Sequence, residues 1–196
     1  MMKRKFGFLI VLILLAFVGT ALGQSADEVK EKAAKVSSKA RSSADKKLGA
    51  SAKALDGTAN SAGEVKVATR LGTQFGMTAD AITAEKNQLG TSWGNLMIAH
   101  TLAANAKSGI TVAQLVQMHD SGMGWGQIAA GLGFKLGEAI SAVKAEGRVA
   151  KGLSKPSGKV ATIHGEGSKA GPGRGAGDHA GSMGGTKMGH GGGKGK

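Results

Sequence analysis

Between residues 64 and 150 the large apolar residues recur at steps of three and four, and this spacing restricts the possible folds more than any other feature. The positions are Val67, Leu71, Phe75, Ile82, Leu96, Leu102, Leu115, Met118, Ile128, Leu132, Ile140 and Val143. Steps of three and four place side chains on one face of an α-helix, whereas a half-buried strand needs alternation at every second residue. No β-branched stretch alternates in that way, so the sequence predicts an all-α domain.

Two short motifs each occur twice within this region. Gly-Met-Thr-Ala at residues 76–79 returns 33 residues later as Gly-Ile-Thr-Val at 109–112. Trp-Gly-Asn-Leu at 93–96 returns 32 residues later as Trp-Gly-Gln-Ile at 125–128. Two matched blocks at nearly the same offset predict an internal duplication. We expect two packed helix-hairpin units that share a helix, at about residues 64–106 and 96–149.

Capping residues set the expected ends of these helices. Thr78 and Thr111 are placed to cap the N-termini of two short helices, and Gln114 completes a capping box with Thr111. Gly76 and Gly109 fit the position after a helix, where a positive φ is favourable mainly for glycine. The predicted helices span residues 64–75, 79–88, 92–106, 112–121, 125–132 and 135–149.

The preceding segment, residues 24–63, is rich in Ala, Ser and Lys. Its apolar positions also recur at helical spacing, but most are alanines, which bury little area and would anchor a helix weakly. We therefore expect a polar, loosely docked or solvent-exposed helix, followed by a flexible linker from Gly57 to Gly63. The positions are Val29, Ala33, Val36, Ala40, Ala44 and Leu48.

The C-terminal segment, residues 151–196, has the opposite character to the predicted domain. It contains 16 glycines and both prolines of the chain, and it has almost no large apolar side chain. Such a segment buries too little surface to offset its conformational entropy. The sequence predicts a disordered, basic, glycine-rich tail in which order fades from Ser154 onward.

The first 23 residues have the layout of a secretory signal peptide. Lys3, Arg4 and Lys5 precede an unbroken apolar run from residue 6 to residue 18, and a small-residue exit follows with Ala21 and Gly23 at the positions that a signal peptidase reads. The alternative is an uncleaved membrane anchor, since residues 6–23 are just long enough to span a bilayer. We expect cleavage and export to the periplasm or the exterior.

Charge is distributed unevenly along the chain, which has a net charge of +13 and no cysteine. Residues 24–70 carry ten basic and six acidic side chains (+4), residues 71–150 carry five of each, and residues 151–196 carry eight and two (+6). Basic arms around a neutral body suggest contact with an anionic envelope surface or another polyanion, although charge that serves only solubility is an equal alternative. The candidate contacts are Lys151, Lys155, Lys159, Lys169, Arg174, Lys187, Lys194 and Lys196.

Residues 111–140 resemble the helix-turn-helix unit of bacterial transcription factors and recombinases. Ile128-Ala129 followed by residues 132–134, Leu-Gly-Phe, matches the first helix and the turn of that family. The resemblance implies a three-helix shape. The second helix would open with residues 135–138, Lys-Leu-Gly-Glu, rather than with polar side chains aimed at base edges. We therefore keep the fold analogy and do not expect chromosomal DNA as a partner.

The sequence offers no arrangement of residues typical of an enzyme. His100 and His119 lie within predicted helices, and neither a Ser-His-Asp order nor a His-Glu-x-x-His motif occurs. Trp93 and Trp125 hold equivalent positions in the repeat, either as core side chains or as a paired platform for a sugar or apolar ligand. Because aromatic residues are few, we expect both to pack in the core.

The tail contains the one candidate metal site. Five possible ligands are spread through glycine: His164, His179, Met183, Met188 and His190, of which the last four form the candidate site. The Asp-His-x-x-x-Met segment at 178–183 is similar to those of exported bacterial copper-resistance proteins. Thioethers suit Cu(I), and imidazoles suit copper, nickel or zinc. The resemblance implies weak copper or nickel binding, since a flexible chain must be ordered around the ion; a chance occurrence in a glycine-rich tail is the alternative.

Taken together, these features predict a non-enzymatic exported protein that binds or scaffolds in the cell envelope, with basic arms that contact anionic surfaces. The alternative is a periplasmic or secreted metal-binding protein that uses the tail. Membrane association after cleavage of the signal would be peripheral at most.

Overall fold

The computed structural model describes residues 24–164, and over this range the expected all-α class is confirmed. The described residues form eight helices and no strand. The helices are α1 (Ala26–Ala34), α2 (Ser38–Ala62), α3 (Glu64–Phe75), α4 (Ala79–Gln88), α5 (Trp93–Asn105), α6 (Val112–Asp120), α7 (Trp125–Gly131) and α8 (Leu136–Ala150).

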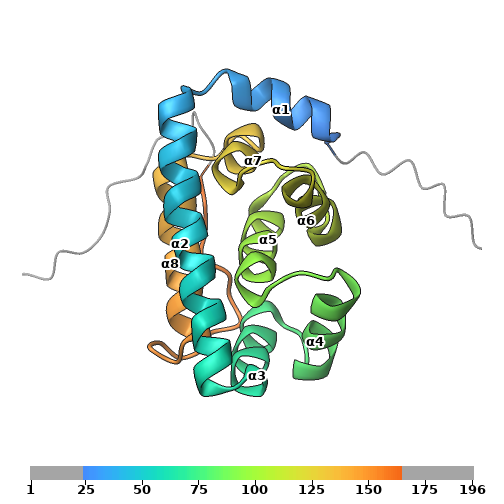
Figure 1. Ribbon diagram of the computed structural model, residues 1–196, viewed down its shortest axis with the longest axis vertical. Helices are drawn as coiled ribbons and strands as arrows, with labels where there is room; N and C mark the ends of the chain where they lie inside the picture. The colour runs from blue at the N-terminus through green and yellow to red at the C-terminus, as the bar shows by residue number, and fades with distance from the viewer. Residues whose placement is uncertain (1–23, 165–196) are drawn as a thin grey trace, which may run out of the picture.

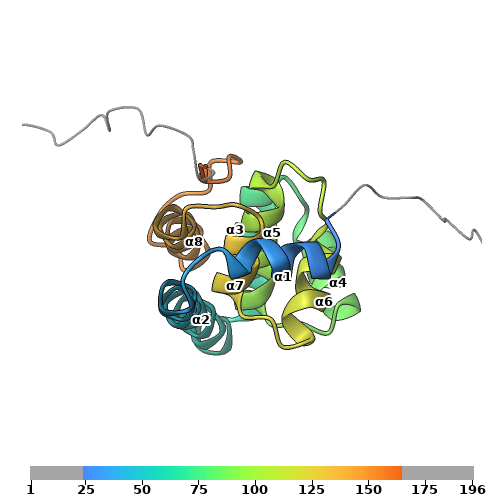
Figure 2. The same ribbon diagram turned by 90° about the horizontal axis from the view of Figure 1, so that it is seen from above.

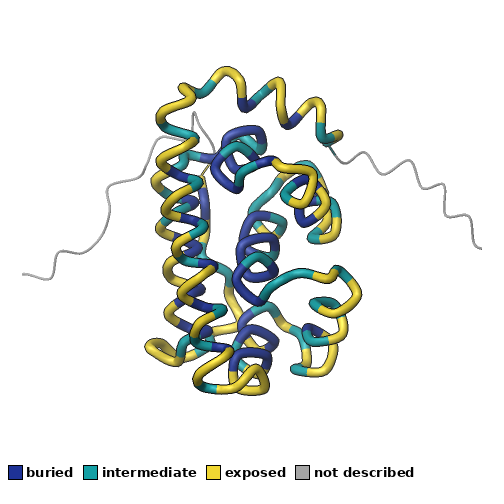
Figure 3. The backbone as a smooth tube through the Cα atoms, viewed as in Figure 1, coloured by how far each residue is buried: buried dark blue, intermediate teal, exposed yellow. Residues whose placement is uncertain are grey.

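Helix α5 forms the centre of the molecule, and the other helices surround it (Figures 1 and 2). The long helices α2 and α8 lie side by side along one flank, α3 and α4 form one end, and α1, α6 and α7 form the other. Figure 3 shows α5 buried along most of its length, whereas α2 exposes its outer face. One hydrophobic core runs through the described chain and includes residues as far apart as Val29 and Ile163.

The six helices predicted between residues 64 and 150 are present, with ends that shift by one residue at most. The Thr78 hydroxyl accepts a hydrogen bond from the Ala81 N–H, and Thr111 and Gln114 form the expected capping box. Gly76 ends α3 with a φ of 72°. The assignment of Gly109 was wrong: its φ is 66°, but α5 ends earlier, at Asn105, and Gly109 lies in the turn before α6.

The expectation of a loosely docked helix and a flexible linker over residues 24–63 is contradicted. The segment forms two helices, because the Ser37 hydroxyl accepts from the Ala40 N–H and starts α2 as a new helix. The Gly57–Gly63 stretch continues α2 instead of forming a linker. The hydroxyls of Thr58 and Ser61 donate to carbonyls one turn earlier, and Ala59 packs in the core.

The alanine-rich stripe of α2 allows close approach of the two helices that begin with tryptophan. A Cβ added to Gly94 in α5 would lie 2.4 Å from the Cα and the carbonyl oxygen of Ala52, and one added to Gly126 in α7 would lie 2.4 Å from the carbonyl oxygen of Arg41. Arg41 and Ala52 are 11 residues apart, which is close to three helical turns. The internal duplication remains a prediction, but its two Trp-Gly pairs dock on α2 in matching ways.

Residues 154–164, which we call the C-terminal strap, return along α8 to its first turn. The strap has no regular secondary structure, and two side-chain amides bind its backbone. The amide of Asn105 accepts from the Ile163 N–H at 2.7 Å and donates to the Ala161 carbonyl at 3.0 Å. The amide of Gln74 does the same with the Ser157 N–H and the Lys159 carbonyl, at 2.9 and 2.8 Å.

The prediction that order fades from Ser154 is therefore wrong for the strap. Ile163 is buried in the core, and the Ala161 N–H donates to the carboxylate of Glu146 in α8 at 2.7 Å. Composition did not predict this because amide and carboxylate side chains of distant helices hold the strap by hydrogen bonds to its backbone. The rest of the predicted tail, residues 165–196, lies outside the described range.

Candidate functional site

The two tryptophans are core residues, as expected, and do not form a ligand platform. Trp93 and Trp125 are each 2% exposed. The Trp125 indole N–H donates to the Asn95 side-chain oxygen at 3.0 Å. The ammonium of Lys86 lies 5.3 Å from the centre of the Trp93 ring and covers it. Neither ring has a free face on which a ligand could stack.

The helical histidines also have structural contacts. His100 Nε2 lies 2.7 Å from the Glu85 carboxylate, and its ring stacks on Phe75, so it links α3, α4 and α5. His119 Nδ1 lies 3.0 Å from the Met123 carbonyl oxygen, and its ring stacks on Trp125. Within residues 24–164, no group of three or more His, Asp or Glu side chains is arranged to hold a metal ion.

The helix that would read DNA in the helix-turn-helix comparison is covered where it begins. α7 and α8 are joined by a turn at Gly133, whose φ is 77°. The Lys135 N–H, at the start of α8, donates to the His164 carbonyl at 3.2 Å, and Glu138 in the first turn contacts the His164 imidazole. The strap thus occupies the first turn of α8, which is the part that would face base edges.

Three of the predicted polyanion contacts fall within the described residues. Lys151 follows α8, and Lys155 and Lys159 are exposed on the strap. The other five lie outside the described residues, as do the predicted signal peptide and the whole candidate metal site. These are Lys169, Arg174, Lys187, Lys194 and Lys196, with His179, Met183, Met188 and His190.

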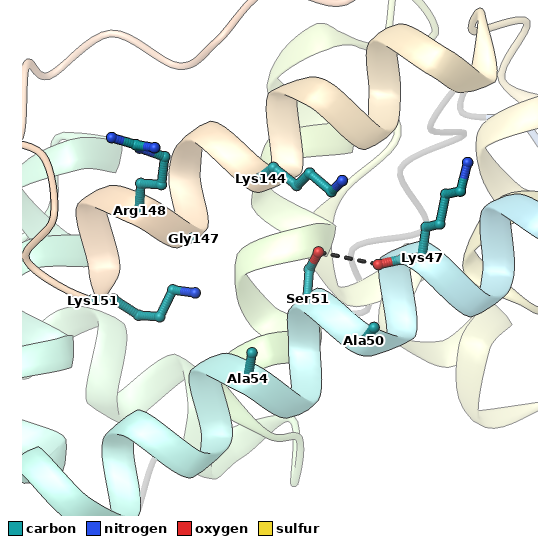
Figure 4. Close-up of a pocket in the computed structure, with 8 residues that line it drawn as sticks. All are labelled: Lys47, Ala50, Ser51, Ala54, Lys144, Gly147, Arg148 and Lys151. Atoms are coloured by element: carbon teal, nitrogen blue, oxygen red, sulfur yellow. Dashed lines mark hydrogen bonds between the residues drawn. The ribbon is translucent and has the colours of Figure 1, made fainter.

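A basic groove runs between α2 and α8, and we refer to it as the α2–α8 groove. Its volume is about 420 Å³, and four of its eight lining residues are cationic. Figure 4 shows Lys144 and Lys151 reaching into the space between the two helices, Lys47 rising from α2 at one end, and Arg148 on the outer side of α8. The remaining lining residues are small: Ala50, Ser51, Ala54 and Gly147.

The acidic residues of α2 are directed away from this groove. The Asp45 carboxylate accepts from the Gly126 N–H at 2.5 Å, at the start of α7. The Asp56 carboxylate accepts from the Gly94 N–H at 2.8 Å, at the start of α5. Each carboxylate satisfies an amide that has no partner within its own helix. Because the two aspartates are 11 residues apart, they share one face of α2, and Lys47 is left on another.

The acidic residues of α8 face the strap, which lies on the side of α8 opposite α2 (Figure 2). Glu138 accepts from the His164 N–H, and this hydrogen bond and the nearby imidazole lower the pKa of Glu138. Glu146 is 1% exposed, and burial raises its pKa, although hydrogen bonds from Ala161 and Gln74 oppose the shift. All four carboxylates of the two helices are thus engaged outside the groove.

None of the four groove cations forms an ion pair with a carboxylate among residues 24–164. The sequence indicated Lys151 as a contact but did not indicate Lys144 and Arg148, because residues 71–150 have no net charge. It did not single out Lys47 either, because Lys47 is one of ten basic residues in 24–70. One signal was available: positions 144, 148 and 151 fall at i, i+4 and i+7, which is one stripe of a helix. The assignment of basic character to the arms alone was incomplete.

Comparison with known proteins gives no relative from which a function could be transferred. Neither a protein family, nor a curated protein, nor a solved structure matches this chain. None of the helices within residues 24–164 has the length and apolar character that crossing a membrane requires. The groove is therefore the feature of the described residues that best indicates a function.

Proposed function

We propose that this protein is a non-enzymatic, exported binding or scaffolding protein that holds an anionic partner in the α2–α8 groove. The observation that carries the proposal is the segregation of charge across the two helices. Four cations line the groove, and every carboxylate of α2 and α8 is bound elsewhere. An anionic ligand would therefore meet attraction without a competing acidic group.

The groove suits binding rather than catalysis. Its lining contains cations, three residues that lack polar side-chain atoms, and Ser51. The Ser51 hydroxyl donates to the Lys47 carbonyl one turn earlier. The groove lining has no carboxylate or imidazole that could serve as a general base, and it has no nucleophile with an adjacent base. The proposal of export depends on residues 1–23 and is tested separately.

Immobilised heparin provides a direct test of groove binding. The variant Lys47→Gln/Lys144→Gln removes one cation from each wall; both residues are exposed, so folding should be unaffected. The control Lys39→Gln/Lys46→Gln removes two exposed cations of α2 that do not line the groove. We expect the groove variant to elute at clearly lower salt than the control, although their net charges are equal. Elution of both at the same salt would show that binding reflects net charge alone.

The alternative of a metal-binding protein rests wholly on His179, Met183, Met188 and His190, outside the described residues. Titrating Cu(I), Cu(II) and Ni(II) into the full chain and into a chain that ends at residue 164 would separate this function from the proposed one. Stoichiometric binding by the full chain alone would favour metal handling.

A further inference from the structure

We propose that the occupant of the α2–α8 groove is a flexible, linear polyanion, which the groove recognises by charge alone, and not a membrane surface. This inference rests on the proposed function and narrows it to one class of ligand. The shape of the groove, the nature of its floor and the positions of its cations each support it.

Two of the four cations, Lys144 and Lys151, lie where a flexible chain can reach them more easily than a flat surface can. Lys144 and Lys151 extend into the space between α2 and α8 (Figure 4), so their ammonium groups line a concavity of about 420 Å³. A bilayer presents an almost flat array of headgroups and contacts convex, exposed features of a protein. A flexible polymer can enter the space between two helices and bring successive charges to both walls.

The lining of the groove contains no large apolar side chain of the kind that helps a peripheral protein enter a bilayer. Val65 and Leu153 are the large apolar residues that are exposed among residues 24–164, and neither lines the groove. Binding to lipid by electrostatics alone would have to use the convex surface. Membrane binding that scales with buried apolar area is not favoured here.

The floor of the groove has no ring on which a base or a sugar could stack. Its residues are Ala50, Ala54, Gly147 and Ser51, and none of the eight lining residues is aromatic. Proteins that hold single-stranded nucleic acid tightly use aromatic rings on which bases stack. Without such rings, the groove provides ion pairs to the backbone of the polymer, so we expect modest affinity that does not depend on the base.

The positions of the cations set the length of polymer that the groove can hold. Lys144, Arg148 and Lys151 extend over seven residue steps along α8 and its C-cap, or about 10 Å at 1.5 Å per residue. Lys47 stands on the opposite wall. Four cations can neutralise at most about four charges of the polymer. Each phosphate contact on a single strand contributes about 0.7 to the slope of log K against log salt, so the groove accounts for a slope of about 3 at most.

The test measures binding of the full chain to a fluorescently labelled oligodeoxythymidylate between about 50 and 200 mM salt. The groove variant Lys47→Gln/Lys144→Gln should lower the magnitude of the salt slope by about 1.4, which corresponds to two lost phosphate contacts. The matched control Lys39→Gln/Lys46→Gln should keep the slope of the parent. An abasic oligomer of equal length should bind as tightly, and inorganic polyphosphate should displace the oligomer.

A second measurement uses vesicles of phosphatidylglycerol in place of the oligomer. Together, the two measurements distinguish failure of the linear-polyanion assignment from failure of the proposed function. Equal vesicle binding by both variants, together with the slope change for the oligomer, supports the linear-polyanion assignment. If the groove variant loses vesicle binding but keeps the slope for the oligomer, the groove binds membrane and this inference is overturned, while the proposed function stands. If neither ligand responds to the groove substitutions, the proposed function itself fails. A clear preference for thymidylate over the abasic oligomer would overturn recognition by charge alone.

Discussion

At the scale of single residues, Gly94 and Gly126 decide how closely α5 and α7 can approach α2. The space that a Cβ would need is filled by the α2 backbone at both positions. Gly57 also lies within a helix, but a Cβ there would meet nothing within 4 Å. Gly57 therefore has a different role from Gly94 and Gly126, although the sequence alone does not distinguish the three.

Gly94→Ala and Gly126→Ala should each lower the free energy of unfolding by at least about 3 kcal/mol, the upper end of the usual cost of overpacking. The new methyl group would meet backbone atoms, which cannot rotate away. Gly57→Ala is the matched control and should raise the free energy of unfolding by about 0.5–1 kcal/mol, because it removes backbone entropy from the unfolded chain. Urea titrations of the three variants would test this, and equal midpoints would contradict the close approach to α2.

Two glutamates of α8 should respond to pH with opposite signs. Burial raises the pKa of Glu146, so the fold favours its neutral form, and its carboxylate is a cost above about pH 4.3, the ordinary pKa of glutamate. Hydrogen bonds from His164 lower the pKa of Glu138, so this carboxylate stabilises the fold above about pH 4.3, and the contribution is lost as the pH falls.

Glu146→Gln should therefore gain stability relative to the parent as the pH rises from 4 to 7. Glu138→Gln should be less stable than the parent at pH 6, and the deficit should shrink toward pH 3. Free energies of unfolding of the parent and both variants, measured between pH 3 and pH 7, would test these opposite responses. A parallel response of the two variants would mean that the strap does not set the environment of these carboxylates.

At the scale of elements, the sequence predicted α3 to α8 well because their signals are local. Helical spacing, the capping threonines and Gly76 act within a few residues, and each could be read directly. The placement of α2 and the strap could not be predicted in this way. The alanines of α2 suggest weak anchoring when they are considered alone, because the sequence does not show that Gly94 and Gly126 pack closely against α2. The strap is held by Gln74 and Asn105, which belong to helices distant in sequence. The groove could not be predicted either, because its charge depends on tertiary contacts that direct the four carboxylates of α2 and α8 away from it.

The strap should contribute to stability, whereas the chain beyond it should not. A chain that ends at residue 164 should unfold at the denaturant concentration of the full chain, since residues 165–196 contain no large apolar side chain apart from Met183 and Met188. A chain that ends at residue 153 should lose at least about 3 kcal/mol, because it exposes the core under Ile163 and removes the hydrogen bonds that the strap makes with Gln74, Asn105 and Glu146. Ile163→Ala in the full chain should reproduce part of this loss. Identical unfolding of the two truncated chains would show that the strap does not pack as described.

At the scale of the whole molecule, folding converts a chain with two basic ends into a body with a basic groove. Lys47 comes from the N-terminal segment and Lys151 from the C-terminal one, and α8 places Lys144 and Arg148 between them. The strap and the starts of α5 and α7 bind the carboxylates of α2 and α8. The same contacts that stabilise the fold therefore leave the groove cationic, which connects stability with the proposed function.

The compartment in which this groove acts depends on the first 23 residues. The basic, apolar and small-residue segments follow the order of a signal peptide, so the mature chain should begin at Gln24 and be recovered outside the cytoplasm. Removing residues 1–23 takes away three basic residues and no acidic one, so the net charge should fall from +13 to +10.

Cell fractionation followed by N-terminal sequencing and intact-mass measurement would establish the compartment and the first residue together. An intact chain from Met1 in the membrane fraction would indicate a retained anchor with the groove held at the bilayer surface. An intact chain in the cytosol would contradict export and make intracellular nucleic acid the polyanion that the groove meets.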